Sequence, residues 1–455
     1  MPNQDLAFTL AEHAARTPLS AIPDAALDHM STDLVDSLAA ILGGLNAPGV
    51  PETRAFIEET VRPGIAVVFG TGLHLPATFA AQANATAGHA LDFDDTLDEG
   101  GGMHAGVPVH TSALAVADEL GAVDGDTYLR AVALGLDIAV RLALAPSHDY
   151  GWHRTSAFGV FGATVAAGRL LELDPETMRN ALGIAYSQAS GNRQCIADGA
   201  LSKRLQSGFA ARDAVTAVRL AQRGLTGATN IFEGANGFFP LYQRGGYDRD
   251  LILRDLGADF LSRRISLKPY PCGRNLHAMT DAALALRDRA GGGAIERVEI
   301  GLDERALATA DRSYPASVVP AQFSRPFATA LALATGRLSI ADFAEPGNAP
   351  SAVKELFDRI DLVPWPESVD GGVRVSVFYR DGSSDHEAAS VASGHPSKPL
   401  SVEQVRAKFL DCNQASGSIL DQSAAGRVIE AALTVRSLRN TRELTGLLAA
   451  VAVTA

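Results

Sequence analysis

Cysteine is scarce in this chain, and its spacing suggests no covalent or metal framework. Cys195, Cys272 and Cys412 are the three cysteines among 455 residues, and they form no CxxC pair. Neither a zinc knuckle nor a disulfide scaffold is therefore indicated. The beginning of the chain, MPNQDLAFTLAEHAA, has the pattern of an amphipathic helix and lacks the basic region and apolar block of a signal peptide. We expect a cytoplasmic protein.

Long apolar runs and an excess of basic residues are also missing. The run 447–453 is too short to cross a bilayer. The 39 basic residues against 52 acidic residues give a net charge of -13, which disfavours nucleic acid and anionic membranes as partners. An anionic substrate would be repelled as well, so a site for one must be locally basic. With 47% hydrophobic and 20% charged residues, the chain fits a globular protein of two or three domains.

The sequence pattern changes along the chain. Helical signals dominate the first 260 or so residues: Asp174-Pro175-Glu176, for example, offers an N-cap followed by a proline at the first helical position. Small residues in 158–171 indicate close helix packing. Residues 297–302 and 373–379 alternate like strands, a turn follows at 380–383, and 362–367 has the composition of a linker.

These patterns predict a mainly α fold with an inserted domain. A helical pattern resumes at Ser401 and continues to the end of the chain. We expect a large discontinuous all-helical domain formed by residues 1–265 and 399–455. A smaller α+β domain, comparable to a lid, would occupy residues 266–398.

The segment HALDFDDT, residues 89–96, concentrates groups that transfer protons, and His104 and His110 follow within one loop. A helix here would place four side chains on one face: His89, Asp92, Phe93 and Thr96. Asp94 and Asp95 would then point elsewhere. A structural reading is also open, because Asp and Thr commonly cap helices and a lone helical His is usually a satisfied core residue.

This segment resembles the hallmark of the MmgE/PrpD family, which includes 2-methylcitrate dehydratases, cis-aconitate decarboxylases and iminodisuccinate epimerases. Four further segments are similar to blocks of the family and occur in the family order: GWHRTSAFG from 151, SKRLQSGFAA from 202, KPYPCGRNLH from 268 and AQFSRPFATA from 321. The resemblance extends from about residue 80 to 335. It implies a dimer, so we expect a homodimer.

The resemblance implies a set of site residues, position by position. Asp92 and Thr96 match the acidic end of the family helix, and His153 matches a family histidine. Lys203 matches the family lysine, with Gly208 in register. His277 ends the KPYPC-type segment, and Tyr314 matches by its distance from AQFSRPF. His104 matches the histidine after the acidic segment, with His110 in reserve because the loop LDEGGGMHAG is longer here than in some members.

The same residue types suit proton transfer next to a carboxylate. Such a step places a second negative charge on an anionic substrate, and Lys203 with Arg204 or Arg274 could offset it by about 3 to 4 kcal/mol per well-placed donor. His104 or His153 would be the base, with Asp92 accepting the other ring N–H of one of them. His277 would be the opposite acid, in a cleft between the domains.

We therefore expect a cofactor-independent lyase, a dehydratase or decarboxylase, acting on a small di- or tricarboxylate. An epimerase or isomerase of a dicarboxylate such as iminodisuccinate is the close alternative. A metal-dependent helical enzyme would use DFDDTLDE and the nearby histidines as ligands, but no second acidic cluster accompanies them. A carboxylate-binding protein without catalysis is the remaining alternative. Cys272 lacks an adjacent base, and the glycine-rich pieces at 100–102 and 291–293 lack a phosphate-binding pattern.

Overall fold

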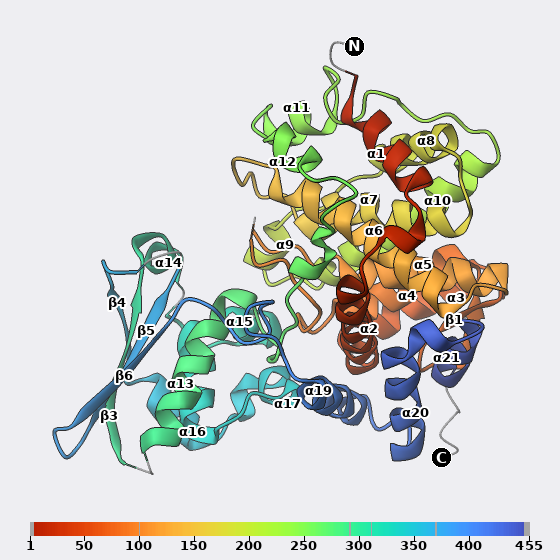
Figure 1. The fold of residues 1–455 in the computed structure, drawn as a ribbon. Helices are drawn as coiled ribbons and strands as arrows, with labels where there is room; N and C mark the ends of the chain where they lie inside the picture. The colour runs from red at the N-terminus through yellow and green to blue at the C-terminus, as the bar shows by residue number, and fades with distance from the viewer. Residues whose placement is uncertain (1–3, 100, 291–292, 311, 369–370, 450–455) are drawn as a thin grey trace. The chain divides into compact units, whose positions relative to one another are not determined.

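The computed structural model describes residues 4–99, 101–290, 293–310, 312–368 and 371–449. Its contacts divide the chain into two compact units. Unit 1 consists of Met1–Leu267 and Val402–Ala455, and unit 2 consists of Lys268–Ser401. Unit 1 is built almost wholly from helices, whereas unit 2 combines helices with a sheet (Figure 1). The prediction of a mainly α fold with a smaller α+β part is confirmed.

Unit 1 contains the long helices of the chain. In order of sequence they are α1 (Leu6–Arg16), α2 (Asp24–Gly44), α3 (Val50–Thr60), α4 (Ala77–Gly88), α5 (Gly106–Leu120), α6 (Gly125–Leu144), α7 (Arg154–Leu170), α8 (Pro175–Tyr186) and α10 (Ser202–Gln222). Shorter helices are α9 (Gln194–Ala197), α11 (Phe238–Gln243) and α12 (Arg249–Leu253). The segment that returns after unit 2 adds α19 (Val402–Ala415), α20 (Gln422–Leu433) and α21 (Arg442–Leu448).

Caps and small residues explain why these helices form and pack closely. Asp174 caps α8 by accepting hydrogen bonds from the amides of Glu176 and Thr177, and Pro175 occupies the first turn, as the sequence predicts. Helix α7 packs against α6, α10 and α5. A Cβ on Gly162 of α7 would lie 2.7 Å from the carbonyl oxygen of Gly135 on α6. Glycine is therefore required at this crossing, and the expected close helix packing is confirmed.

Unit 1 also contains a short hairpin that the expectation of an all-helical domain did not include. Strands β1 (Ala66–Val68) and β2 (Leu73–Leu75) pair antiparallel around the positive-φ glycines Gly70 and Gly72. Asn84 of α4 fixes the hairpin, because its side chain accepts from the amide of Phe69 and donates to the carbonyl of Val67. Three-residue strands are too short to give a clear alternating pattern in the sequence.

Unit 2 is a four-stranded sheet in the order β4-β3-β5-β6, from β3 (Ile295–Leu302), β4 (Ile360–Pro364), β5 (Val373–Tyr379) and β6 (Ser384–Ala389). β3 pairs parallel with β4 and antiparallel with β5, and β5 pairs antiparallel with β6. The helices of the unit are α13 (His277–Ala290), α14 (Glu304–Ala308), α15 (Val318–Phe323), α16 (Arg325–Thr335), α17 (Ile340–Ala344) and α18 (Ser351–Phe357). α13 and α16 cover one face of this sheet (Figure 1).

The core of unit 2 follows the predicted alternation. Val373, Val375 and Val377 of β5 are buried, whereas the residues between them are half-buried. They pack with Leu286 of α13 and Phe327 of α16 in one apolar cluster.

The prediction of a linker at 362–367 is wrong for its first residues, because β4 extends to Pro364 and pairs with β3. β4 is an edge strand, where a proline is tolerated because one side of the strand has no ladder partner. The composition of the segment therefore suggested a linker where the chain forms the end of a strand.

Within the described part of the chain, no helix combines the length and the apolar character needed to cross a bilayer.

Candidate active site

The segment 89–96 is a bent loop, so the helical arrangement considered for it does not form. Helix α4 ends at Gly88, and His89 is its C-cap residue. Asp92 has φ of 52°, in the left-handed region that non-glycine residues rarely adopt and that Asp tolerates better than most. Asp92 and Asp95 bond to groups outside the loop, and Asp94 bonds to His89 within it. Such side-chain bonds compete with helical hydrogen bonding. The loop thereby directs its carboxylates to different partners.

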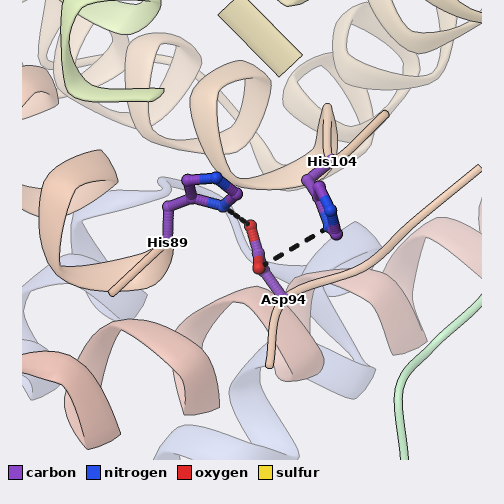
Figure 2. A group of neighbouring side chains, drawn as sticks. All are labelled: His89, Asp94 and His104. Carbon is purple, nitrogen blue, oxygen red and sulfur yellow. Dashed lines mark hydrogen bonds and ion pairs between the residues drawn. The ribbon is translucent and has the colours of Figure 1, made fainter. Parts of the chain in front are cut away.

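His89, Asp94 and His104 form the centre of this site (Figure 2). Nδ1 of His89 lies 2.7 Å from Oδ2 of Asp94, and both side chains are fully buried. His104 has its own partner, because its Nδ1 donates to the carbonyl oxygen of Asp95 at 2.6 Å. Its Nδ1 is 3.7 Å from Oδ1 of Asp94. Nε2 is therefore the basic nitrogen of the His104 ring in its neutral form.

Lys203 joins the centre from the first turn of α10. Its Nζ lies 2.6 Å from Oδ1 of Asp92 and 3.1 Å from Nε2 of His89. Gly208 brings α10 close to α4, since a Cβ there would lie 2.2 Å from Oγ1 of Thr86. The side chain of Lys203 is 9% exposed, so the ammonium and its carboxylate partner interact in a poorly solvated region. Lys203 thus brings an ammonium group into this site, paired there with the carboxylate of Asp92.

Asp92 and Asp94 contact different partners in the structure. Asp92 pairs with Lys203, and Asp94 is the carboxylate that accepts from a histidine, namely His89. The prediction that Asp92 orients His104 or His153 stays a prediction.

The ring of His153 also lies near that of His89, with 5.3 Å between the ring centroids. It is the N-cap residue of α7, and its amide donates to the carbonyl oxygen of Gly191. Its Nδ1 is buried and has no hydrogen-bond partner among the described residues. Burial lowers the pKa of His153 well below its usual value, and the nearby ammonium of Lys203 lowers it further. His153 is therefore neutral at pH 7 and suited to accept a proton.

Several buried carboxyl groups lie in and around the loop and are called the acidic layer here: Asp33, Asp36, Asp94 and Asp95. Burial and the neighbouring Asp33 and Asp94 raise the pKa of Asp95 well above its usual value, although its Oδ2 accepts from the amide of Gly106. Lys408 of α19 places its Nζ 2.6 Å from Oδ1 of Asp36 and 2.6 Å from the carbonyl oxygen of Phe93. The last part of unit 1 therefore anchors the loop.

His110, the reserve candidate, lies in this layer. Its Nε2 is 3.1 Å from Oδ2 of Asp33, and its Nδ1 is 2.6 Å from the hydroxyl of Tyr128. Burial lowers the pKa of His110 to about 3, while burial and Asp36 raise the pKa of Asp33 well above its usual value. A hydrogen shared between Asp33 and His110 fits the opposite directions of these two shifts. His104, not His110, is the histidine next to His89 in the site, with 5.1 Å between the centroids of their rings.

Thr96 and Arg204 are the remaining predicted residues of unit 1. Thr96 is fully buried, its backbone pairs with Ser266, and its Oγ1 has no hydrogen-bond partner among the described residues. The guanidinium of Arg204 donates to the carbonyl oxygen of Pro48, just before α3. Consecutive helical residues point about 100° apart, so Lys203 and Arg204 reach different neighbours.

Arg274, His277 and Tyr314 belong to unit 2. His277 is fully buried, its Nε2 donates to the carbonyl oxygen of Cys272 at 3.2 Å, and its Nδ1 lies 3.4 Å from Nη1 of Arg274. The hydroxyl of Tyr314 donates to the carbonyl oxygen of Pro346, and its ring packs edge-on against Phe327 and Phe357 of the same unit. The roles expected for these three side chains stay predictions.

The His89, Asp94 and His104 group is compact enough to be tested as a metal site, since one possible ligand atom from each lies within 4.8 Å of the others. Chemistry argues against that use. The carbonyl oxygen of Asp95 can only accept, so Nδ1 of His104, the nitrogen facing Asp94, carries a hydrogen and has no lone pair for a cation. The ammonium of Lys203 next to His89 would also repel one. The cluster is better suited to holding protons.

Sequence reasoning missed three functional side chains: His89 and Asp94 as site residues, and Lys408 as an anchor. His89 and Asp94 were visible in the segment itself, and a turn instead of a helix would have allowed them to meet. Lys408 is one polar residue in an amphipathic helix, more than 300 positions from Phe93, and the sequence carried no signal for this contact.

The domains of one family match most of the chain. The MmgE/PrpD N-terminal domain matches residues 9–249, and the MmgE/PrpD C-terminal domain matches residues 270–435. The chain therefore belongs to the MmgE/PrpD family, as its motifs indicated.

Curated relatives are similar over long stretches. "Cis-aconitate decarboxylase-like protein oryM" of Aspergillus oryzae is 23% identical over 98% of this chain and 98% of its own length. "Cis-aconitate decarboxylase" of Aspergillus terreus is 25% identical over 94% of this chain and 92% of its own length. The mouse protein of the same name is 29% identical over 74% of this chain and 71% of its own length. These matches confirm the expected enzyme class, a lyase.

Proposed function

We propose that this chain decarboxylates a small unsaturated tricarboxylate such as cis-aconitate, without a cofactor. The hydrogen bonds of Lys203 are the main support for this proposal. Its ammonium has three N–H groups, of which His89 and Asp92 accept two. The third N–H has no partner among the described residues and can donate to a substrate carboxylate. The names of the relatives support cis-aconitate as the substrate to test first.

In the proposed reaction, the bond between a carbon and a carboxylate breaks and CO2 leaves. The electron pair remains on the substrate and spreads onto a neighbouring carboxylate, where the ammonium of Lys203 offsets the added charge. A protonated imidazole then delivers a proton to carbon. His104 suits this role, because its Nδ1 is held by the carbonyl of Asp95 and its Nε2 can carry the transferred proton.

The lowered pKa of His153 supports a second candidate function. A neutral imidazole with a lowered pKa is a proton acceptor at pH 7. Such a base fits abstraction of a proton next to a carboxylate, the step that dehydration of a 2-methylcitrate-like acid and epimerisation of iminodisuccinate share.

One experiment separates these reactions. The purified protein is incubated in deuterated water with cis-aconitate, with 2-methylcitrate and with iminodisuccinate, and each mixture is followed by NMR. We expect loss of CO2 from cis-aconitate, with one deuterium entering at carbon. Lys203→Ala should abolish this turnover, whereas Lys354→Ala, at an exposed lysine of α18, should leave it unchanged. Folded wild-type protein that alters none of these acids would contradict the proposal.

A further inference from the structure

The hydrogen-bond chain from Lys203 to Asp94 has a fixed direction. A lysine ammonium can only donate, so Nε2 of His89, 3.1 Å from Nζ of Lys203, must accept and carry no hydrogen. The hydrogen of the neutral ring is then on Nδ1, 2.7 Å from Oδ2 of Asp94. The carboxylate of Asp94 is an acceptor in this arrangement. Lys203 therefore donates to His89, and His89 donates to Asp94.

Burial makes this direction important for the geometry of the site. The side chains of His89 and Asp94 are 0% exposed, so bulk water is not available to replace a misdirected hydrogen bond. In the opposite tautomer, the Nε2–H of His89 would face the N–H groups of Lys203. Two donors would then oppose each other next to a positive charge. The ammonium would have to move away from the ring.

Asp94 lies beside two histidines and is hydrogen-bonded to His89. His104 donates its Nδ1–H to the carbonyl oxygen of Asp95 at 2.6 Å and lies 3.7 Å from Oδ1 of Asp94. The tautomer of His104 is thus set by a backbone group that substitution of Asp94 does not remove. His89 has Asp94 as its Nδ1 acceptor (Figure 2).

We infer that Asp94 is a positioning residue that acts through His89. It holds the imidazole in the Nδ1–H tautomer, so that Nε2 receives one N–H of Lys203 while Asp92 receives a second. Two fixed acceptors orient the ammonium, and its third N–H is directed to the substrate. The inference rests on the proposed function as far as turnover is concerned, but the tautomer itself can be measured without any substrate.

The substitution that tests this is Asp94→Asn, which preserves shape but can donate through its amide. An amide N–H facing Nδ1 would place the ring hydrogen on Nε2. We expect kcat to fall at least about a hundredfold, the order of the losses seen when a supporting acceptor or its tautomer is disturbed. Asp361→Asn, an exposed carboxylate on β4, is the matched control and should leave kcat unchanged.

Making the same substitution in His89→Gln protein distinguishes a positioning role of Asp94 from a general structural effect. The amide of Gln can accept from Lys203 and donate to either Asp or Asn, so it has no tautomer to lose. In His89→Gln protein, adding Asp94→Asn should lower kcat by less than about tenfold further. An equal loss in both backgrounds would overturn the inference, because Asp94 would then act independently of His89.

The tautomer is read directly by NMR of protein labelled with 15N-histidine. The His89 signal is identified by its absence in His89→Gln protein. We expect the Nδ1–H form in the wild type and the Nε2–H form in Asp94→Asn protein. An Nε2–H form in the wild type would refute the inference, even if turnover is normal. If the wild type shows the Nδ1–H form but alters no acid of the panel, the proposed function fails and the positioning role stands.

Discussion

Replacing Lys408 with Met should destabilise unit 1 strongly, because this lysine anchors the site loop. Its Nζ lies 2.6 Å from both Oδ1 of Asp36 and the carbonyl oxygen of Phe93, and 4.0 Å from the centroid of the Phe93 ring. The side chain of Lys408 is 4% exposed and that of Asp36 is 0% exposed. Met has a similar length and apolar stem, so the substitution removes the charge and its hydrogen bonds with little change in packing.

The size of the effect follows from the burial of the pair. Removing one partner of a buried ion pair leaves a buried charge without compensation, which typically costs about 3 to 5 kcal/mol. The cost should not greatly exceed this range, because Asp36 can take up a proton. Typical domains are stable by about 5 to 15 kcal/mol, so the loss is a large fraction of the total. The carbonyl of Phe93 sits between Asp92 and Asp94, and turnover should therefore fall as well.

The measurement is urea unfolding followed by circular dichroism, with the free energy of unfolding compared at a constant m-value. Lys398→Met is the control: that lysine pairs with Asp281 at 3.2 Å but is 53% exposed, and such pairs contribute less than about 1 kcal/mol. Adding Asp36→Asn to Lys408→Met should recover part of the loss, since no buried charge is then left alone. A loss below about 1 kcal/mol for Lys408→Met, or no recovery in the double variant, would refute the reasoning.

Four further outcomes are expected. In the second candidate function His153 is the base, and because its pKa is lowered the ring stays unprotonated as the pH falls to 6.5, so kcat/KM for that reaction should decline only below that value. His153→Gln should remove this limb of the pH-rate profile and cost about a hundred- to ten-thousandfold. Activity should survive exhaustive EDTA treatment, and loss with recovery by one metal would instead assign a ligand role to the histidine cluster. Light scattering should give a homodimer, and a monomer at micromolar concentration would contradict this. Exchange of a substrate proton with solvent should fail in at least one of His104→Ala, His153→Ala and His277→Ala, and three folded variants with wild-type rates would mean that the site is wrong.

Local signals in the sequence predicted the elements that local chemistry determines. Asp174 and Pro175 mark the start of α8 because capping and a fixed φ act within one turn. The alternation of 373–379 predicted β5 because its side chains face a core and a wetter surface in turn. Pro364 suggested a linker where β4 ends, because a proline-containing segment at the end of an edge strand resembles a linker in composition.

The site could be predicted as a set of residues but not as a set of contacts. The resemblance of the motifs pointed to Asp92, His104, His153 and Lys203, which the structure groups around His89. The partners within the loop could not be assigned, because spacing alone treats 89–96 as a helix. Asp92 has a left-handed backbone, which residue spacing does not reveal. Its carboxylate pairs with Lys203, 111 positions away, and such a contact depends on the tertiary fold.

Lys408 also explains why unit 1 needs the segment that returns after unit 2. Helix α19 packs against α2, and this packing brings Lys408 to Asp36 of α2 and to the loop at Phe93. Several buried carboxylates lie around that loop, and burial with mutual repulsion raises the pKa values of Asp33 and Asp95. The ammonium of Lys408 opposes this effect at Asp33. Residues 1–267 alone would leave this acidic layer without that cation, so the loop that holds Asp92 and Asp94 is complete only when both parts of the helical unit are joined.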